Sequence, residues 1–305
     1  MSTLFSTYTA SATNAQDVSD VVTNVSPKDS PLFSMLGSNT GVARVKEQVQ
    51  DSLEAADAAN AIAEGGSLTT PDTIAVRTLE SNTMQIFTKT ISVTGSQEAV
   101  AKYGGVKSEI NYQVKKRFTE LARDVEKALI VGTSASGTTA VARTLSGLVE
   151  KITTNTATAN LTGTTWVGTA TANLEAFEEL LNDLFDQMFE TGQAPDTVLV
   201  GGKLKRRISK LTSKVTRNID AEKKTQILSI NIYDSDFGTV NIILDRYVTD
   251  ATLLAVALDM VEVSYLRRFS QFKLAKTNDS TQVAIVGELT LDMRTEKAAG
   301  KVIAS

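Results

Sequence analysis

The sequence predicts an α+β fold organised around one long helix, which we call the spine helix. Residues 107–131 contain no Gly or Pro, and six apolar residues recur there at steps of three or four, as on one face of a helix. These residues are Ile110, Val114, Phe118, Leu121, Val125 and Leu129. Residues 282–294 largely alternate between apolar and polar, as in a strand with one buried face. The helix would be about 37 Å long, with the six apolar residues as its core face.

The composition is that of a folded protein that lacks the usual catalytic side chains. Of its 305 residues 42% are hydrophobic, and a formal net charge of −4 argues against binding DNA or anionic membranes through overall charge. The longest apolar run, 253–258, is far shorter than the roughly 20 residues of a membrane span, and the first ten residues lack a signal-peptide pattern. Cys and His are absent, which excludes the Ser-His-Asp triad, thiolate nucleophiles and Cys/His zinc sites. We therefore expect a cytosolically made protein that is not an enzyme and uses no cofactor or metal.

The first 40 residues are predicted to form an arm that docks on another surface. They are mostly small and polar up to the segment SPKDSPLFSMLG at 26–37. Pro27 and Pro31 favour an extended course with few backbone donors. The apolar residues expected to anchor this arm are Leu32, Phe33 and Met35.

Two strand-like segments, 43–49 and 74–93, flank an Ala-rich acidic stretch. Together they predict a long two-stranded ribbon. Because an isolated ribbon is only marginally stable in water, we expect contact with another surface to complete it.

Residues 148–250 contain two helical patterns of opposite charge. The first begins at Asn173 as N-cap and ends at Gly192, and the second covers 203–219; a short buried strand, 197–200, lies between them. The acidic candidates are Glu178, Glu179 and Asp183, and the basic candidates are Lys205, Arg206, Arg207 and Lys210. The pattern predicts either a nucleic-acid-facing patch or complementary faces, within one subunit or between neighbours. We favour complementary faces, because the two helices are so close in sequence.

After residue 221 strands dominate the prediction, at 230–233, 240–244, 253–258 and 282–294. Two glycine-bearing motifs are interpreted as structural. GGVKS at 104–108 lacks the spacing of a phosphate-binding loop, and DSDFG at 234–238 lacks the Glu that closes a calcium loop. We interpret the first as a helix entry and the second as a hairpin turn.

The order of these segments, and several of their sequences, resemble the major capsid proteins of tailed bacteriophages with the Hong Kong 97-type fold. The segments that carry the resemblance include SPKDSPLFSMLG, QDSLEAADAANAIAEGG, NTMQIFTKTISVTGSQEAVAKYGG, ELARDVEKALIVG, SGLVEKITTN, YDSDFGTVNIILDRY and LAKTNDSTQVAIVGELTLDMRTEKAAG. They run from about residue 17 to 302 in a shared order, and so cover nearly the whole chain.

The resemblance implies an N-terminal arm at 1–40, an extended loop at 41–96, a peripheral domain with the spine helix at 97–147 and 251–305, and an axial domain at 148–250. It implies a major capsid protein that self-assembles into hexamers and pentamers, forming the icosahedral head shell around phage double-stranded DNA. The implied partners are other copies, a portal protein, a separate scaffolding protein, a decoration protein, and DNA bound without sequence specificity; no membrane is involved. The protein would be assembled in the bacterial host cytoplasm and reside in the virion. Lys115, Lys116 and Arg117 of the spine helix would stay solvated or face a neighbour or the lumen.

Two alternatives remain at this point. A cargo-storing bacterial nanocompartment shares the implied fold, and packaged DNA would distinguish a phage head from it. A monomeric enzyme is the alternative of a different class, but the sequence offers no catalytic constellation to support it.

Overall fold

The computed structural model describes residues 30–66, 74, 76–101, 106–159, 171–211, 232–276 and 278–304. Within them the chain divides into two compact units. The smaller comprises 89–120 with 271–285, and the larger comprises the described parts of 29–88, 121–270 and 286–305. Each unit consists of several separate segments of the chain, and the boundaries between the units fall inside the spine helix and inside three strands. The four-part division expected from the resemblance is of another kind and stays a prediction.

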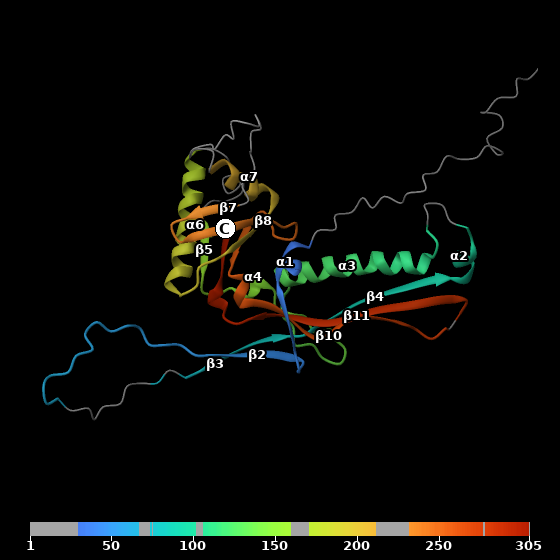
Figure 1. The fold of residues 1–305 in the computed structure, drawn as a ribbon, viewed down its shortest axis with the longest axis horizontal. Helices are drawn as coiled ribbons and strands as arrows, with labels where there is room; N and C mark the ends of the chain where they lie inside the picture. The colour runs from blue at the N-terminus through green and yellow to red at the C-terminus, as the bar shows by residue number, and fades with distance from the viewer. Residues whose placement is uncertain are drawn as a thin grey trace, which may run out of the picture. The chain divides into compact units, whose positions relative to one another are not determined.

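The spine helix is α3, Glu109–Val131, as the apolar stripe predicted (Figure 1). A four-stranded sheet has the order β1-β10-β11-β4, formed by Gly37–Thr40, Val261–Lys273, Ser280–Met293 and Gln85–Thr94. The helix α2, Gly95–Ala99, directly follows β4, and the side chain of Thr94 caps its first turn. The long strand β11 confirms the period-two pattern at 282–294.

The arm segment forms a short helix, α1, Pro31–Met35, before it enters β1. The expectation of an extended course was wrong here, because a proline at the first helical position has its φ already set for a helix and lacks only a donor that would have no partner there. After α1 the chain does become extended, since β1 pairs in parallel with β10, Gly37 opposite Glu262 and Thr40 opposite Tyr265. Residues 1–29 of the predicted arm lie outside the described part.

The predicted two-stranded ribbon is present as β2, Val45–Gln50, and β3, Thr78–Thr83, which pair antiparallel (Figure 1). One detail differs from the expectation. The run expected at 74–93 is interrupted at the buried Met84, so that β3 belongs to the ribbon while β4 belongs to the four-stranded sheet.

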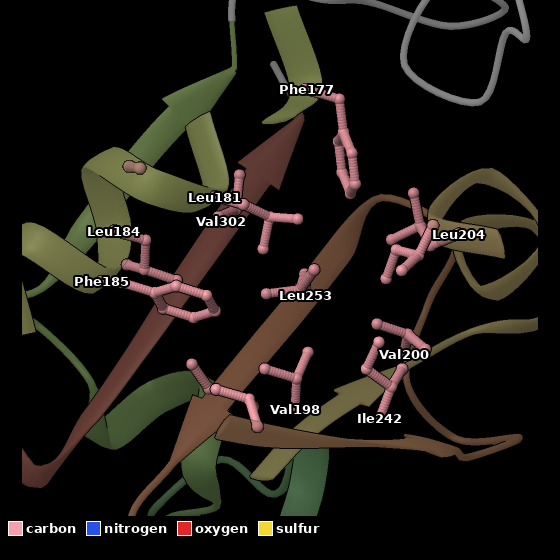
Figure 2. Packing of buried hydrophobic residues seen from close by; sticks show 14 of the residues in the cluster. Phe177, Leu181, Leu184, Phe185, Val198, Val200, Leu204, Ile242, Leu253 and Val302 are labelled. Carbon is pink, nitrogen blue, oxygen red and sulfur yellow. The ribbon is translucent and has the colours of Figure 1, made fainter. Parts of the chain in front are cut away.

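A six-stranded sheet has the order β5-β12-β9-β6-β8-β7. Its strands are Thr156–Ala159, Ala299–Ala304, Thr252–Val256, Thr197–Val200, Gly238–Leu244 and Ile232–Ser235. The helices α6, Thr171–Glu190, and α7, Gly202–Leu211, pack on it through one apolar core (Figure 2). In that core Phe177, Leu184 and Leu204 contact a layer of strand residues such as Leu253. The remaining short helices are α4, Leu148–Lys151, and two single 3₁₀ turns at Leu258–Met260 and Glu296–Ala298.

In this region one helix boundary differs from the sequence expectation, one helix is described only in part, and one strand was not predicted. The helix α6 begins at Thr171 rather than after an N-cap at Asn173. It ends at Glu190, and Gly192, whose φ of +93° suits glycine, follows two residues later. The predicted basic helix is described as far as Leu211, and the rest of it lies outside the described residues. The strand β10 was not predicted, because its second half is polar and exposed and carries no alternating apolar signal.

Candidate assembly site

The arm is anchored to the spine helix by a buried carboxylate. Glu126 lies on the core side of α3, and its two carboxyl oxygens accept the backbone N–H groups of Leu32 and Phe33 at 2.8 and 2.7 Å. Leu32 is fully buried, whereas Phe33 and Met35 are half-buried. Glu126 therefore binds the two donors that begin α1, with Leu32 as the apolar anchor that the sequence predicted.

Glu126 faces a second buried carboxyl group, that of Asp245. Asp245 Oδ1 accepts the N–H of Tyr247 at 2.7 Å, while within the described residues its buried Oδ2 has no donor. Burial, together with the hydrogen bond to Asp245, raises the pKa of Glu126 to about 8. At neutral pH Glu126 therefore keeps its proton, which is the donor available to Asp245 Oδ2.

The ribbon turns its polar face, not its apolar face, toward its own subunit. Asp292, which is almost completely buried, accepts hydrogen bonds from Gln48 Nε2 at 2.9 Å and Asn39 Nδ2 at 2.7 Å, and it pairs with Lys46 at 3.3 Å. On the other strand Glu80 pairs with Lys151 at 2.8 Å. The sequence predicted the alternation of this strand correctly but could not predict that its polar side would be the inner one.

Asn82 is a second buried member of this polar contact. Its amide nitrogen donates to the carbonyl oxygens of Ser146 and Leu291, both at 2.9 Å, and its amide oxygen accepts the N–H of Ser146 at 2.9 Å. Three hydrogen bonds therefore fix the base of the ribbon to two separate segments of the larger unit.

We expect Asn82→Ala to lower the free energy of unfolding by about 2 kcal/mol, because it leaves the buried groups of Ser146 and Leu291 without their partner. Urea denaturation followed by circular dichroism measures this difference. Ser81→Ala is the matched control, because Ser81 is the neighbouring residue and its side chain is exposed. This substitution should change the free energy of unfolding by less than about 0.5 kcal/mol. Equal stability of the two variants would contradict the role given to Asn82.

The outward face of the ribbon is open to solvent and carries a pair of large apolar side chains. Val49 and Leu79 lie directly opposite each other in the register, with exposed fractions of 66% and 59%. Beyond the paired strands, Leu53, Ile74 and Val76 are almost fully exposed. Val49 and Leu79 form what we call the outer ribbon face, a pair of large apolar side chains that the described part of the subunit leaves uncovered.

The charged candidates of α6 and α7 divide into exposed and inward-facing groups. Glu179, Asp183, Arg206 and Lys210 are exposed, and Glu178 is half-buried. Lys205 donates from Nζ to the carbonyl oxygen of Ile242 at 3.0 Å, and burial lowers its pKa.

The expectation that Arg207 faces a neighbour or the lumen is wrong. Its side chain is fully buried, and its guanidinium lies 4.5 Å from the centre of the Phe177 ring. Burial lowers its pKa to about 10, which still leaves it charged at neutral pH. The physical reason is its place in the helix, since it immediately precedes the buried Ile208 and so turns toward the sheet.

The apolar stripe of the spine helix is buried in only one half. Leu121, Val125 and Leu129 are buried, Ile110 and Val114 are half-buried, and Phe118 is 37% exposed. The assignment of Phe118 to the core was therefore wrong for the described part of the single subunit, where its side chain is left partly open to solvent. On the same helix Lys115 and Lys116 are exposed, and Arg117 is bonded to Glu120.

In the described residues no cluster of acidic side chains could hold a metal ion, and no helix there has the length and apolarity of a membrane span. Sequence reasoning missed the residues that hold arm and ribbon, namely Glu126, Asp245, Asn82 and Asp292. A signal existed for Glu126, because it has apolar neighbours at positions 125, 129 and 130 and so interrupts a buried helix face.

Comparison with solved structures identifies the fold. A structure from Microbacterium phage Oxtober96 matches with a TM-score of 0.64 and 15% identity over 98% of this chain and 99% of that one. The capsid of the native GTA particle matches with a TM-score of 0.69 and 10% identity, covering 99% and 100%. The SrpI encapsulin of Synechococcus elongatus matches with a TM-score of 0.58 and 11% identity, covering 99% and 95%. The chain thus has the Hong Kong 97-type fold, an α+β fold of shell-forming proteins, as the sequence predicted.

Sequence comparison then distinguishes phage capsid from encapsulin. The model of the SU10 major capsid protein family matches residues 4–304, and this chain belongs to that family. A segment of 108 residues is also 32% identical to the major capsid protein of Escherichia phage Phieco32, covering 35% of this chain and 30% of that relative's length. The family is one of structural virion proteins and not of enzymes.

Proposed function

We propose that this chain assembles with copies of itself into hexamers and pentamers, which form the icosahedral head shell around phage double-stranded DNA. The observation that carries the proposal is the outer ribbon face. A ribbon whose polar side is already bonded to its own subunit, and whose apolar side is open, needs a second surface to cover that apolar side. A neighbouring copy provides such a surface, and symmetric closure provides one for every ribbon.

The other expected partners fit the same assembly. A portal protein would occupy one vertex, a separate scaffolding protein would guide the shell, and a decoration protein would bind its outside. Packaged DNA would be held without sequence specificity, as the net charge of −4 gives the chain no general affinity for phosphates. The subunits would assemble in the bacterial host cytoplasm and remain in the virion.

Val49→Glu combined with Leu79→Glu tests the proposal. Both side chains are exposed, so we expect the double variant to keep the unfolding midpoint of the unmodified chain, whereas rings, tubes or shells should disappear from electron micrographs. Glu47→Gln with Ser81→Thr is the matched control, because these two residues face outward at the neighbouring register pair without adding charge.

Two results would count against the proposal. One is that the unmodified chain stays monomeric at high concentration under all conditions; the other is that the double variant forms normal shells. Nuclease-protected DNA inside shells formed during infection would support a phage head over a storage compartment.

A further inference from the structure

The exposed side of α6 carries an unusually uniform acidic stripe. Its members recur at steps of four, four, three and four, which places them on one face of the helix, and all are exposed. They are Glu175, Glu179, Asp183, Asp186 and Glu190, and we call them the acidic stripe. The opposite face of α6 packs into the core through Phe177, Leu181 and Leu184. The stripe spans 15 residues of rise, or about 22 Å.

Such a stripe destabilises the helix that carries it. Like charges at i,i+4 cost about 0.2–0.5 kcal/mol per pair, and three such pairs occur here. Glu179, Asp183, Asp186 and Glu190 form no ion pair within the described part of the subunit. Cations that compensate their charge must therefore come from outside the described part of the subunit.

The exposed side of α7 carries cations at a matching spacing. Lys203, Arg206 and Lys210 recur at steps of three and four and are all exposed, and we call them the basic stripe. Lys203 also pairs with Asp250 at 3.0 Å, an exposed contact that contributes little to stability. Because Lys205 and Arg207 turn inward, the outward charge of α7 is confined to this one line.

The two stripes lie on neighbouring helices of one layer, and these helices contact each other. The helix α6 packs over β5 and β12 and also places Phe189 against Phe237 in the turn between β7 and β8, whereas α7 packs over β8. The apolar core beneath both helices fixes them in place (Figure 2). A contact between two different patches of identical subunits is heterologous, and such contacts close into rings when a rotation relates the copies.

We propose that the acidic stripe of one copy pairs with the basic stripe of the neighbouring copy within a capsomer. The partner is a second copy of this chain, so the inference rests on the proposed self-assembly. Charge complementarity of this kind fixes register and suppresses wrong orientations, since like stripes repel each other. A nucleic-acid role for the basic stripe is less well supported, because the acidic stripe in the same layer repels phosphates.

Charge reversal tests the pairing. One variant carries Asp183→Lys and Asp186→Lys, a second carries Lys203→Glu and Arg206→Glu, and a third carries all four changes. We expect each of the first two to reduce the yield of capsomers and shells about tenfold or more, as measured by electron microscopy and sedimentation, because like charges then meet. The third variant restores opposite charges across the contact and should recover most of the yield. Thermal unfolding of all three tells assembly defects from folding defects.

Lys273→Glu with Lys276→Glu is the matched control, since it changes the net charge as much as the second variant at exposed positions outside both stripes. Assembly of the control should be unaffected. If the unmodified chain assembles but the fourfold variant recovers nothing, or if either reversal alone assembles normally, the pairing is overturned while self-assembly stands. If the basic-stripe variant forms normal shells that retain less DNA, the stripe binds nucleic acid instead. If the unmodified chain never assembles, the proposed function fails first and the pairing with it.

Discussion

Val125→Asp is expected to abolish the soluble folded subunit. Val125 is fully buried on the core face of α3, so an aspartate there would place a negative charge without a partner in the core. Burying a charge without a partner costs several kcal/mol, about 4 kcal/mol or more, which is a large part of the stability of a typical domain. The soluble fraction after expression and the circular dichroism of any soluble protein measure the effect.

Phe118→Asp is the matched comparison on the same helix. With 37% of the Phe118 side chain exposed, an aspartate can reach water there, and we expect a soluble folded subunit with modestly lower stability. Insoluble Phe118→Asp, or soluble Val125→Asp with an unchanged unfolding midpoint, would contradict the division of the spine helix into a buried and an open half. Lys116→Ala should leave folding intact, because Lys116 is exposed.

The stability of the subunit is expected to fall as the pH rises from about 5 to 8, through the proton held between Glu126 and Asp245. The pKa of Glu126 is raised to about 8 in the folded state, so the folded protein keeps a proton that the unfolded chain loses near the ordinary carboxyl pKa. The stabilisation is therefore complete below that ordinary pKa, decreases as the pH rises toward 8, and changes no further above it. Each unit of pKa difference corresponds to about 1.4 kcal/mol.

Asp245→Asn should flatten this dependence. The amide can donate a permanent hydrogen bond to Glu126 while its oxygen still accepts the N–H of Tyr247, so Glu126 no longer needs the shared proton. Urea denaturation at pH 5, 6.5, 8 and 9 gives the difference between this variant and the unmodified chain. Asp259→Asn is the control, because Asp259 is exposed. Parallel pH profiles for the unmodified chain and Asp245→Asn would refute the shared proton.

The sequence predicts the elements of this fold better than it predicts their contacts. The spine helix, the acidic helix and β11 follow from strong periodicity over many residues, which local sequence is enough to encode. The strand β10 escaped prediction because the two apolar residues of its exposed half, Phe269 and Phe272, are three positions apart and do not alternate with polar residues. Its position depends on its neighbours β1 and β11, which lie far away in the sequence.

The candidate site depended even more on distant residues. That Glu126 binds the arm, or that Asp292 binds Gln48 and Lys46, follows only once segments more than 90 residues apart lie together. The charged helices were recognised from composition, but which of their side chains face outward required the position of the sheet. Arg207 illustrates this limit, since its residue type is typical of a surface and its place in the helix is not.

The ribbon turns its polar face toward its own subunit, and this has a consequence for how the subunit could change shape. Beyond Asn82, the ribbon is bound to the rest of its subunit through the polar side chains of Lys46, Gln48 and Gln50. Water can replace these bonds, so detaching the ribbon there exposes little apolar surface. Detaching its outer face from a neighbouring copy would instead expose Val49 and Leu79 to water again, at a cost of about 25 cal/mol per Å² of apolar surface. If the ribbon packs on a neighbouring copy as proposed, that copy would hold it more strongly than its own subunit does beyond Asn82. Movement of the ribbon would then be easier before the shell closes than afterwards.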